Sequence, residues 1–393
     1  MDKRNLINKE FWKASPNDAQ TLMESFEEII PDESILNDCE IDFLYKDKDF
    51  YFRRVIWSTS LGIAKGGLRF NKDKITPVSI LKSLSVLLIY KSALFNLPYS
   101  GSAGEIHLIT DKKTKLQALK KYTQLWFKAG LHLTDILSPD MGTSISDMSH
   151  IYKVLSKYIS APMKFLNGKP VELGGCEGRD KATSYGAEVC IEHLIKKEGS
   201  RFPKKGKVSF FGFGNSTKPL YSFFTKLGYT VVAISNSQGF YYDPVGIKLS
   251  SDYSNLKKYN KSKNPKDIFN KKTDIFVAGY KEDTVDSNKL LETGTSVFIE
   301  IANNPLISKN INKSLDKKIL RVPGILINSG GFLASHYENM VAEKIVKNNK
   351  IELYKFIKKL IKNKTNEVLN LIKTKKYTMP QSAFYISLKN IKK

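Results

Sequence analysis

A glycine-punctuated turn near the middle of the chain has the composition of a dinucleotide-binding site. The apolar run Val208–Phe211 leads into Gly212-Phe213-Gly214-Asn215, and a helical pattern follows from Leu220. Glycines let the backbone approach a pyrophosphate, and the next helix supplies free N–H groups and the positive end of its dipole. Thr217 stands where the full fingerprint has a third glycine. The pattern favours a nucleotide-binding βαβ unit, and an ordinary strand–turn–helix stays open at this point.

Two lysines and one aspartate have the types that carboxylate binding and proton transfer require. Lys65 adjoins a Gly-Gly turn, where a lysine can point into a cleft, and a fixed cation there suits a carboxylate. Lys91 lies inside an apolar run, where an unpaired cation is costly, and its extension to solvent is an equally good interpretation. Asp140 follows Pro139 in a loop. It could transfer protons, although a turn or a helix cap is the simpler role for such an aspartate.

The composition indicates a globular protein large enough for two cores. Of the 393 residues 41% are hydrophobic, and no apolar run reaches the ~20 residues that span a bilayer. The first residues contain no apolar signal segment. The three cysteines, Cys39, Cys176 and Cys190, are scattered and form neither a disulfide framework nor a zinc-ligand pattern. We therefore expect a cytoplasmic protein without metal ligands and without a membrane segment.

The formal net charge of +24 raises the question of a nucleic-acid partner. The lysines are spread along the whole chain and do not gather beside aromatic residues. Abundant lysine, asparagine and isoleucine are typical of an AT-rich coding sequence. We therefore expect no nucleic-acid partner, while the charge still attracts anionic small molecules.

Hydrophobic patterns predict strands and helices in alternation. Residues 1–37 look helical and polar, and Phe43–Ile56 resembles one strand. Helices are predicted at Ile80–Leu97, which is apolar and expected to be buried, at Gln117–Leu131 and at Ser146–Tyr158. Short apolar strands are predicted at Val208–Phe211, Thr230–Ile234, Ile275–Ala278, Val297–Ile301 and Ile325–Ile327. With helices between them, these strands indicate a parallel sheet. Residues 345–361 have helical spacing with lysines on what we expect to be a solvated face.

Several short motifs occur in one consistent order. They are Lys65-Gly66-Gly67-Leu68-Arg69-Phe70, Tyr90–Leu94, Leu97–Gly101, Pro139-Asp140-Met141, Gly174–Arg179, Ala182–Gly186, Gly212–Asn215, Asn328–Glu338 and Ser382–Ile386. Together they resemble the glutamate/leucine/phenylalanine/valine dehydrogenase family, from about Phe43 to the end of the chain. The resemblance implies an α/β fold with two domains: an N-terminal substrate-binding and oligomerisation domain, 1–180, and a Rossmann-like parallel-sheet domain, 181–365. The last helix, about 366–393, would return to the first domain.

The resemblance also implies a reaction and its participants. Family members convert an L-amino acid to a 2-oxo acid and ammonia, or the reverse, with NAD or NADP. The expected partners are therefore a small amino acid or 2-oxo acid and further copies of the chain, in a homo-oligomer such as a hexamer. Lys91 matches the lysine that binds the α-carboxylate. Lys65 and Ser335 match the residues that bind the distal carboxylate in members acting on glutamate, which favours glutamate over leucine or phenylalanine.

Further positions match by resemblance alone. Asp140 matches the catalytic aspartate. Thr183 and Asn328 match residues that contact the nicotinamide amide and ribose, and Asn215 keeps the glycine-rich turn. Asn236 lies after the second strand, where an acidic residue would hold a ribose 2′-hydroxyl. Because Asn236 has an amide in place of a carboxylate, we do not expect the protein to prefer NAD strongly over NADP. Lys218 is available to bind a phosphate, although a solvated surface lysine is the simpler interpretation. Gly324 stands where members often carry Asp.

The most serious departure is Ala103, which occupies the position of the family's catalytic lysine. Glu105 stands where a glycine is usual, and there is no lysine between Lys91 and Lys112 to substitute. His107 is near in sequence, but its face on a strand is open. Alanine neither transfers a proton nor stabilises developing charge, so a loss of ~10²–10³ in rate is expected. Two functions follow: a dehydrogenase with an altered proton relay, or an impaired member that binds a dicarboxylate or dinucleotide as a regulatory subunit.

Overall fold

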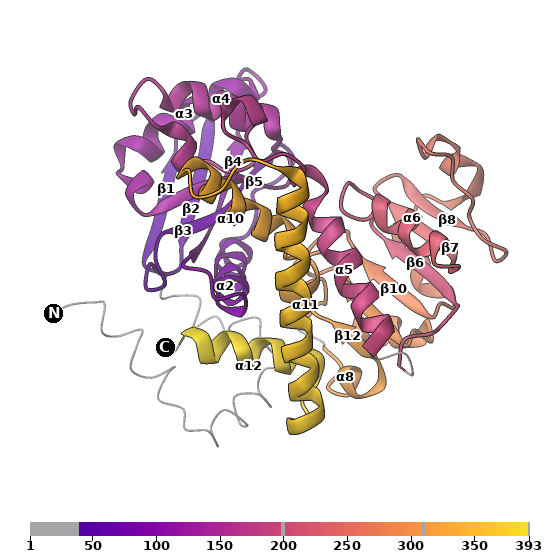
Figure 1. Cartoon of the computed structure of the whole chain (residues 1–393). Coiled ribbons are helices and arrows are strands. Elements are labelled where there is room, and N and C mark those ends of the chain that lie inside the picture. The colour runs from indigo at the N-terminus through magenta and orange to yellow at the C-terminus, as the bar shows by residue number, and fades with distance from the viewer. Residues whose placement is uncertain (1–38, 198–200, 309–310, 392–393) are drawn as a thin grey trace.

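The computed structural model describes residues 39–197, 201–308 and 311–391, which form two lobes, each built on one sheet (Figure 1). The expected α/β fold with a parallel-sheet domain is confirmed. The following elements are those that position the side chains singled out above.

The first sheet has the strand order β1-β2-β4-β3-β5. Its strands are β1 (Ile41–Lys46), β2 (Phe50–Ile56), β3 (Ala64–Asn71), β4 (Ser100–Leu108) and β5 (Asp135–Pro139). Strand β3 pairs in parallel with β4 and β5, while β1, β2 and β4 pair antiparallel. Because β3 lies between β4 and β5, it brings the Lys65 segment beside both the Ala103 segment and the end of β5.

Helices cover both faces of this sheet. On one face lie α3 (Lys115–Lys128) and α4 (Ile145–Leu155), each begun by a capping box, from Thr114 and Ser144 respectively. On the other face lies α2 (Val78–Leu94), whose side chains are apolar nearly all round. A helix of that composition is stable only when it is buried on several sides. It packs against the sheet, α12 and α9.

The second sheet has the order β12-β11-β10-β6-β7-β8-β9. Its strands are β6 (Lys207–Phe211), β7 (Thr230–Asn236), β8 (Gly239–Tyr242), β9 (Asn260–Ser262), β10 (Ile275–Ala278), β11 (Val297–Glu300) and β12 (Leu320–Val322). The five strands from β12 to β7 are parallel, and β8 and β9 continue the sheet antiparallel. The carboxyl ends of the parallel strands therefore meet at one edge, where ligands of such sheets bind.

Helices of the C-terminal half lie around and between the two sheets. They are α5 (Ala182–Lys197), α6 (Lys218–Lys226), α7 (Ser287–Glu292), α8 (Leu315–Lys318), α9 (Gly324–Ile327), α10 (Gly330–Ala342), α11 (Lys350–Lys375) and α12 (Met379–Ile391). The long α11 runs beside α5 between the lobes, and α12 lies against α2 (Figure 1). There the Tyr90 and Phe384 rings meet edge to face, and Asn390 Nδ2 donates to the Ala93 carbonyl.

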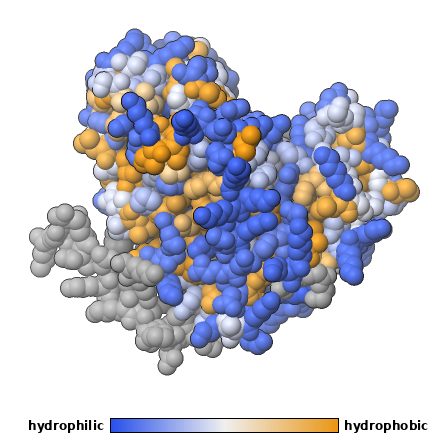
Figure 2. Space-filling view, in the orientation of Figure 1, coloured by the Kyte–Doolittle hydropathy of each residue, from blue (hydrophilic) through white to orange (hydrophobic). Residues whose placement is uncertain are grey.

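The lysine-rich helix α11 presents its charge to solvent. Its buried residues recur at helical spacing, from Leu353 and Ile357 to Ile361 and Val368. Figure 2 shows hydrophilic residues over the outer side of this helix. The arrangement agrees with the solvated face that the sequence predicts. Among the described residues, none of the helices has the length and apolarity needed to cross a membrane.

Three predicted elements differ from the structure. The predicted strand Phe43–Ile56 is the hairpin β1–β2, because Asp47 accepts the amides of Asp49 and Phe50 and closes a turn. The predicted strand Ile325–Ile327 is the helical turn α9, which starts after Pro323. The helix predicted from residue 345 begins only at Lys350, where Asn349 caps it. The helical prediction for residues 1–37 lies outside the described residues.

Candidate functional site

The glycine-rich turn joins β6 to α6 and contains one strained and one open glycine. Gly212 has a φ of +99°, and a Cβ there would lie 2.4 Å from the backbone of Gly279, so only glycine fits. A Cβ on Gly214 would meet nothing within 4 Å. Thr217 Oγ1 accepts the Gly214 amide at 2.9 Å and donates to the Gly212 carbonyl at 3.0 Å. The threonine therefore fixes the turn where a third glycine was expected.

The other predicted cofactor residues lie at the same edge of the second sheet or facing it. Asn236 ends β7, and its Oδ1 accepts the Gln238 amide at 2.8 Å, which closes the turn into β8. Thr183 faces the first turn of α10, because a Cβ on Gly331 would lie 2.5 Å from its Oγ1. Asn328 is buried, and its Nδ2 donates to the Ile301 carbonyl at 3.1 Å. Within the described part of the chain, the Asn215 side chain forms no hydrogen bond or ion pair that assigns it a role.

Lys91 does not extend to solvent. It lies in the last turn of α2, 5% exposed, and its Nζ donates to Asn328 Oδ1 at 2.6 Å. Burial lowers the pKa of Lys91 to about 8, against the opposing field of Asp140. Lys91 therefore connects the first lobe to a predicted cofactor residue of the second, within electrostatic range of the predicted catalytic aspartate.

Lys65 is a buried lysine that forms no ion pair with a carboxylate of the described residues. It is 1% exposed, its Nζ donates to the Ser335 carbonyl at 3.2 Å, and the Tyr99 ring centroid lies 3.8 Å from Nζ. Burial lowers the pKa of Lys65 well below its usual range, and Glu338 opposes this only in part. A buried lysine of this kind gains charge stabilisation from an incoming anion.

A second cation that the sequence analysis gave no role lies beside Ser335. Arg179 Nη2 donates to Ser335 Oγ at 2.9 Å, and Arg179 Nε lies 3.4 Å from Glu338 Oε2. Glu338 is fully buried and also pairs with Lys169 at 2.6 Å. Ser335 thus receives Lys65 on its carbonyl and Arg179 on its hydroxyl. The Gly174–Arg179 motif was the available signal, but no spacing rule assigned its arginine.

Asp140 follows β5 and lies in an ion pair. Its Oδ2 accepts from Arg69 Nε at 2.6 Å, and its side chain is 30% exposed. The role of helix cap belongs instead to Ser144, which caps α4. Arg69 is buried and also pairs with Glu282 of the second lobe. Although burial opposes the charge, Asp140 and Glu282 raise the pKa of Arg69 above its usual value.

Ala103 is 3% exposed and packs with Val55 of β2 and with Leu81 and Leu84 of α2. Glu105 is buried on the same strand, where it accepts the Thr76 amide at 2.9 Å. It therefore holds the segment before α2.

His107 Nδ1 lies 3.1 Å from the Asn71 carbonyl, at the far end of β3. Its neighbour Glu105 accepts from Asn71 Nδ2 at 3.0 Å. Both side chains are thus committed to the segment that follows β3. Neither replaces the lysine expected at position 103.

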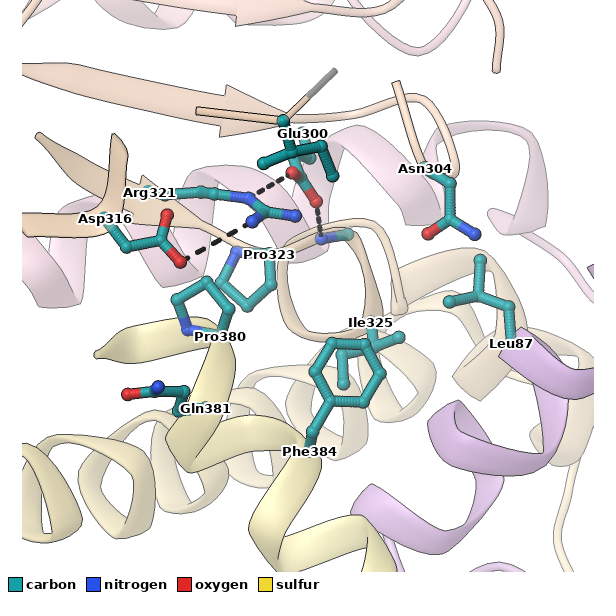
Figure 3. Close-up of a pocket in the computed structure, with 12 residues that line it drawn as sticks. Leu87, Glu300, Asn304, Asp316, Arg321, Pro323, Ile325, Pro380, Gln381 and Phe384 are labelled. Atoms are coloured by element: carbon teal, nitrogen blue, oxygen red, sulfur yellow. Dashed lines mark hydrogen bonds and ion pairs between the residues drawn. The ribbon is translucent and has the colours of Figure 1, made fainter. Parts of the chain in front are cut away.

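A small cavity of about 40 Å³ lies apart from these groups, between the second sheet and α12 (Figure 3). Glu300 accepts from Arg321 Nε at 2.6 Å and from the Gly324 amide at 2.8 Å, and Asp316 lies on the other side of the guanidinium. The cavity has room for a water or two. The charged side chains around the cavity pair with one another. Gly324, at the position where family members often carry Asp, donates its backbone amide to Glu300.

Comparison with known proteins identifies what this geometry is similar to. The family described as "Glutamate/Leucine/Phenylalanine/Valine dehydrogenase" matches residues 174–393, and its "Glu/Leu/Phe/Val dehydrogenase, dimerisation domain" matches residues 47–157. Within the described residues there is no cluster of three or more His, Cys, Asp or Glu side chains that could hold a metal ion.

Two curated relatives have the same degree of similarity. The NAD-specific glutamate dehydrogenase of Staphylococcus aureus (strain COL) is 26% identical over 360 residues, which cover 87% of this chain and 84% of that protein. The cryptic catabolic NAD-specific glutamate dehydrogenase GudB of Bacillus subtilis is also 26% identical, with 88% and 83% covered.

Solved structures share the fold at lower identity. The hetero-hexameric glutamate dehydrogenase of Thermus thermophilus in its Leu-bound form superposes with a TM-score of 0.78 at 23% identity, covering 96% of this chain and 97% of that one. The glutamate dehydrogenase of Plasmodium falciparum superposes with a TM-score of 0.73 at 19% identity, covering 96% and 93%.

Proposed function

Since this chain belongs to the Glutamate/Leucine/Phenylalanine/Valine dehydrogenase family and is an NAD(P)-dependent amino-acid dehydrogenase, we propose that it interconverts L-glutamate with 2-oxoglutarate and ammonia. The observation that carries the choice of glutamate is that Lys65 and Arg179 both reach Ser335, from different elements. Arg179 already pairs with Glu338, whereas Lys65 is 1% exposed and forms no ion pair with a carboxylate among the described residues. An apolar side chain in this pocket would leave the Lys65 ammonium uncompensated, which is unfavourable.

The rest of the site supports an extended dicarboxylate. Lys91 receives the α-carboxylate and Lys65 the distal one, so that the substrate lies along β3 and the end of α2. Asp140 lies within the electrostatic range of Lys91 and is the group placed to exchange protons at the reacting nitrogen and water. Gly214, the α6 N-terminus, Thr183 and Asn328 would hold the dinucleotide. That cofactor supplies the hydride-transfer chemistry when bound.

We propose that either NAD or NADP serves. The two relatives are NAD-specific by name, but at 26% identity their preference does not transfer by itself. The end of β7 offers the amide of Asn236, not a carboxylate, so that nothing at this position repels a 2′-phosphate. The net charge of +24 favours the more anionic cofactor.

We further propose a cytoplasmic homo-oligomer with domains at 1–180 and 181–365 and with 366–393 returning to the first. The three cysteines are free, which suits a reducing compartment. The N-terminal half matches a dimerisation domain. The comparisons do not favour an impaired subunit that only binds ligands. We still expect a low turnover number, because Ala103 stands at the position of the family's catalytic lysine.

Ligand binding tests the glutamate proposal independently of turnover. We expect 2-oxoglutarate to raise the thermal unfolding temperature of the wild-type protein, and Lys65→Leu to reduce that shift. The same variant should improve protection by the 2-oxo acid of leucine. Lys121→Leu removes an ion pair with Asp47 on the α3 face and is the matched control. Equal protection of wild type and Lys65→Leu by 2-oxoglutarate would place the distal carboxylate elsewhere.

A further inference from the structure

The ion pair of Asp140 extends through Arg69 to the second lobe. Arg69 Nε bonds Asp140 Oδ2 at 2.6 Å, while Arg69 Nη1 lies 3.5 Å from Glu282 Oε2 and Nη2 bonds Glu282 Oε1. Glu282 follows β10, so one guanidinium joins carboxylates from the two lobes. Arg69 is 3% exposed and fixed on β3. Such a buried, bidentate arrangement has far less freedom than a surface ion pair.

The position of Ala103 relative to Asp140 leaves Arg69 as the cation at this carboxylate. Position 103 lies on β4, between the pairs Lys65–Gly101 and Leu68–Gly104, and therefore beside Gly67. A Cβ on Gly67 would lie 2.6 Å from the Asp140 Cβ. A lysine at 103 would start one strand away from Asp140, beside Gly67. With Ala103 there, Arg69 is the cation that, among the described residues, forms an ion pair with Asp140.

We propose that Arg69 and Glu282 form a positioning pair for Asp140, in which Glu282 of the second lobe fixes Arg69 and Arg69 fixes the catalytic carboxylate. This rests on the proposed function of Asp140. The guanidinium keeps its proton throughout, so it orients the carboxylate and stabilises its charge without entering proton transfer. Because Glu282 belongs to the nucleotide-binding lobe, Asp140 takes its working position only when the two lobes are together.

Glu282 and Asp140 hold the two sides of one guanidinium, so each side of the pair can be removed separately. Removing Glu282 releases one side of the Arg69 guanidinium, which can then turn away from Asp140. Removing Arg69 takes away the group that bonds the Asp140 carboxylate itself. Both changes should therefore lower kcat more than they raise KM.

The test compares Glu282→Gln, Arg69→Met and Arg69→Lys, each in the wild type and in Ala103→Lys. We expect Arg69→Met to lower kcat further than Glu282→Gln does, because it removes the group bonded to Asp140. Arg69→Lys should keep most of the wild-type kcat. Glu282→Gln should lower kcat by about tenfold with a smaller change in KM. Glu192→Gln removes an exposed ion pair with Lys196 on α5 and is the control.

A second readout works without turnover. The Asp140 amide donates to Thr143 Oγ1, and the Thr143 amide to the Asp140 carbonyl. We expect Glu282→Gln to reduce the protection of both amides in hydrogen exchange, while the control leaves them unchanged. If Glu282→Gln loses amide protection while neither the wild type nor Ala103→Lys turns over glutamate, the positioning pair is supported and the proposed function is rejected. Unchanged protection together with an unchanged kcat in Glu282→Gln would overturn the pair and reduce Glu282–Arg69 to an interdomain contact.

Discussion

We propose that the side chain at position 103 limits how much chemistry this site retains. The position faces α2, among Val55, Leu81 and Leu84. It lies beside Gly67 of β3, and β3 in turn pairs with β5, which Asp140 follows. Ala103 fills an apolar position, so the expected loss is one of rate, because a catalytic cation in a closed site is worth ~10²–10³.

We predict that the wild-type protein oxidises glutamate slowly and that Ala103→Lys raises kcat. A lysine stem can pass the apolar residues of α2 and place its ammonium at Asp140. Ala103→Met, of similar length and without charge, is the control. The nicotinamide absorbance assay would contradict this if wild type turned over at ~10 s⁻¹ and the lysine variant were no faster.

A second residue-scale prediction concerns Lys91. Because burial lowers the pKa of Lys91 to about 8, the ammonium that we propose binds the α-carboxylate is lost as the pH rises through that value. Substrate binding stabilises the charged form, so the affinity for 2-oxoglutarate should fall above about pH 8. Lys91→Arg stays charged and should remove this fall. A fluorescence titration in which the arginine variant keeps the same alkaline limb would assign it to another group.

At the scale of elements, the two glycines of the β6–α6 turn have different roles: Gly212 is required by the fold, and Gly214 leaves space for the cofactor. Gly212→Ala should destabilise the protein, because φ is +99° and the added Cβ would meet Gly279 at 2.4 Å. Gly214→Ala should fold normally, because nothing lies within 4 Å, yet it should weaken dinucleotide binding by occupying the space of the pyrophosphate. Thermal unfolding and cofactor titration of both variants distinguish the two roles. Equal cofactor affinity in Gly214→Ala and wild type would move the pyrophosphate away from this turn.

The β7–β8 turn carries the prediction on cofactor choice. We expect the wild type to bind NAD and NADP within about tenfold, or ~1.4 kcal/mol. Asn236→Asp keeps the acceptor for the Gln238 amide and adds the missing carboxylate, so it should shift the preference toward NAD. Asn366→Asp on α11 adds the same charge far from the turn and is the control. Exclusion of NADP by the wild type beyond this range would mean that another acidic residue reaches the ribose.

At the scale of the whole molecule, we expect a hexamer. The dimerisation-domain match covers residues 47–157, and closed symmetric assemblies are the common outcome for chains that carry such a domain. Sedimentation equilibrium at micromolar concentration should give a mass near six chains. A monomer under those conditions would contradict the proposed assembly and leave the cleft of a single chain to act alone.

The sequence by itself determined several of the elements and the class of protein. Periodicity located the buried α2, the parallel strands β6, β7, β10 and β11, and the glycine-rich turn, because these patterns depend on neighbours three to four residues away at most. Ordered motifs then indicated the family. The hydrophobic patterns gave a wrong element in two places. Side-chain hydrogen bonds of Asp47 close the β1–β2 turn inside a predicted strand, and Pro323 starts the helical turn α9 where a strand was predicted.

Only the tertiary structure decided which cations and carboxylates meet. Lys65 and Ser335 lie 270 residues apart in sequence, and Arg69 and Glu282 lie 213 apart. Their contact follows from the meeting of the two lobes, which no periodicity of the chain encodes. The same holds for Arg179 at Ser335 and for the burial of Lys91, where the sequence left solvent extension open. Burial and charge pairing are properties of the assembled lobes, so only the three-dimensional structure shows which groups of this site can act together.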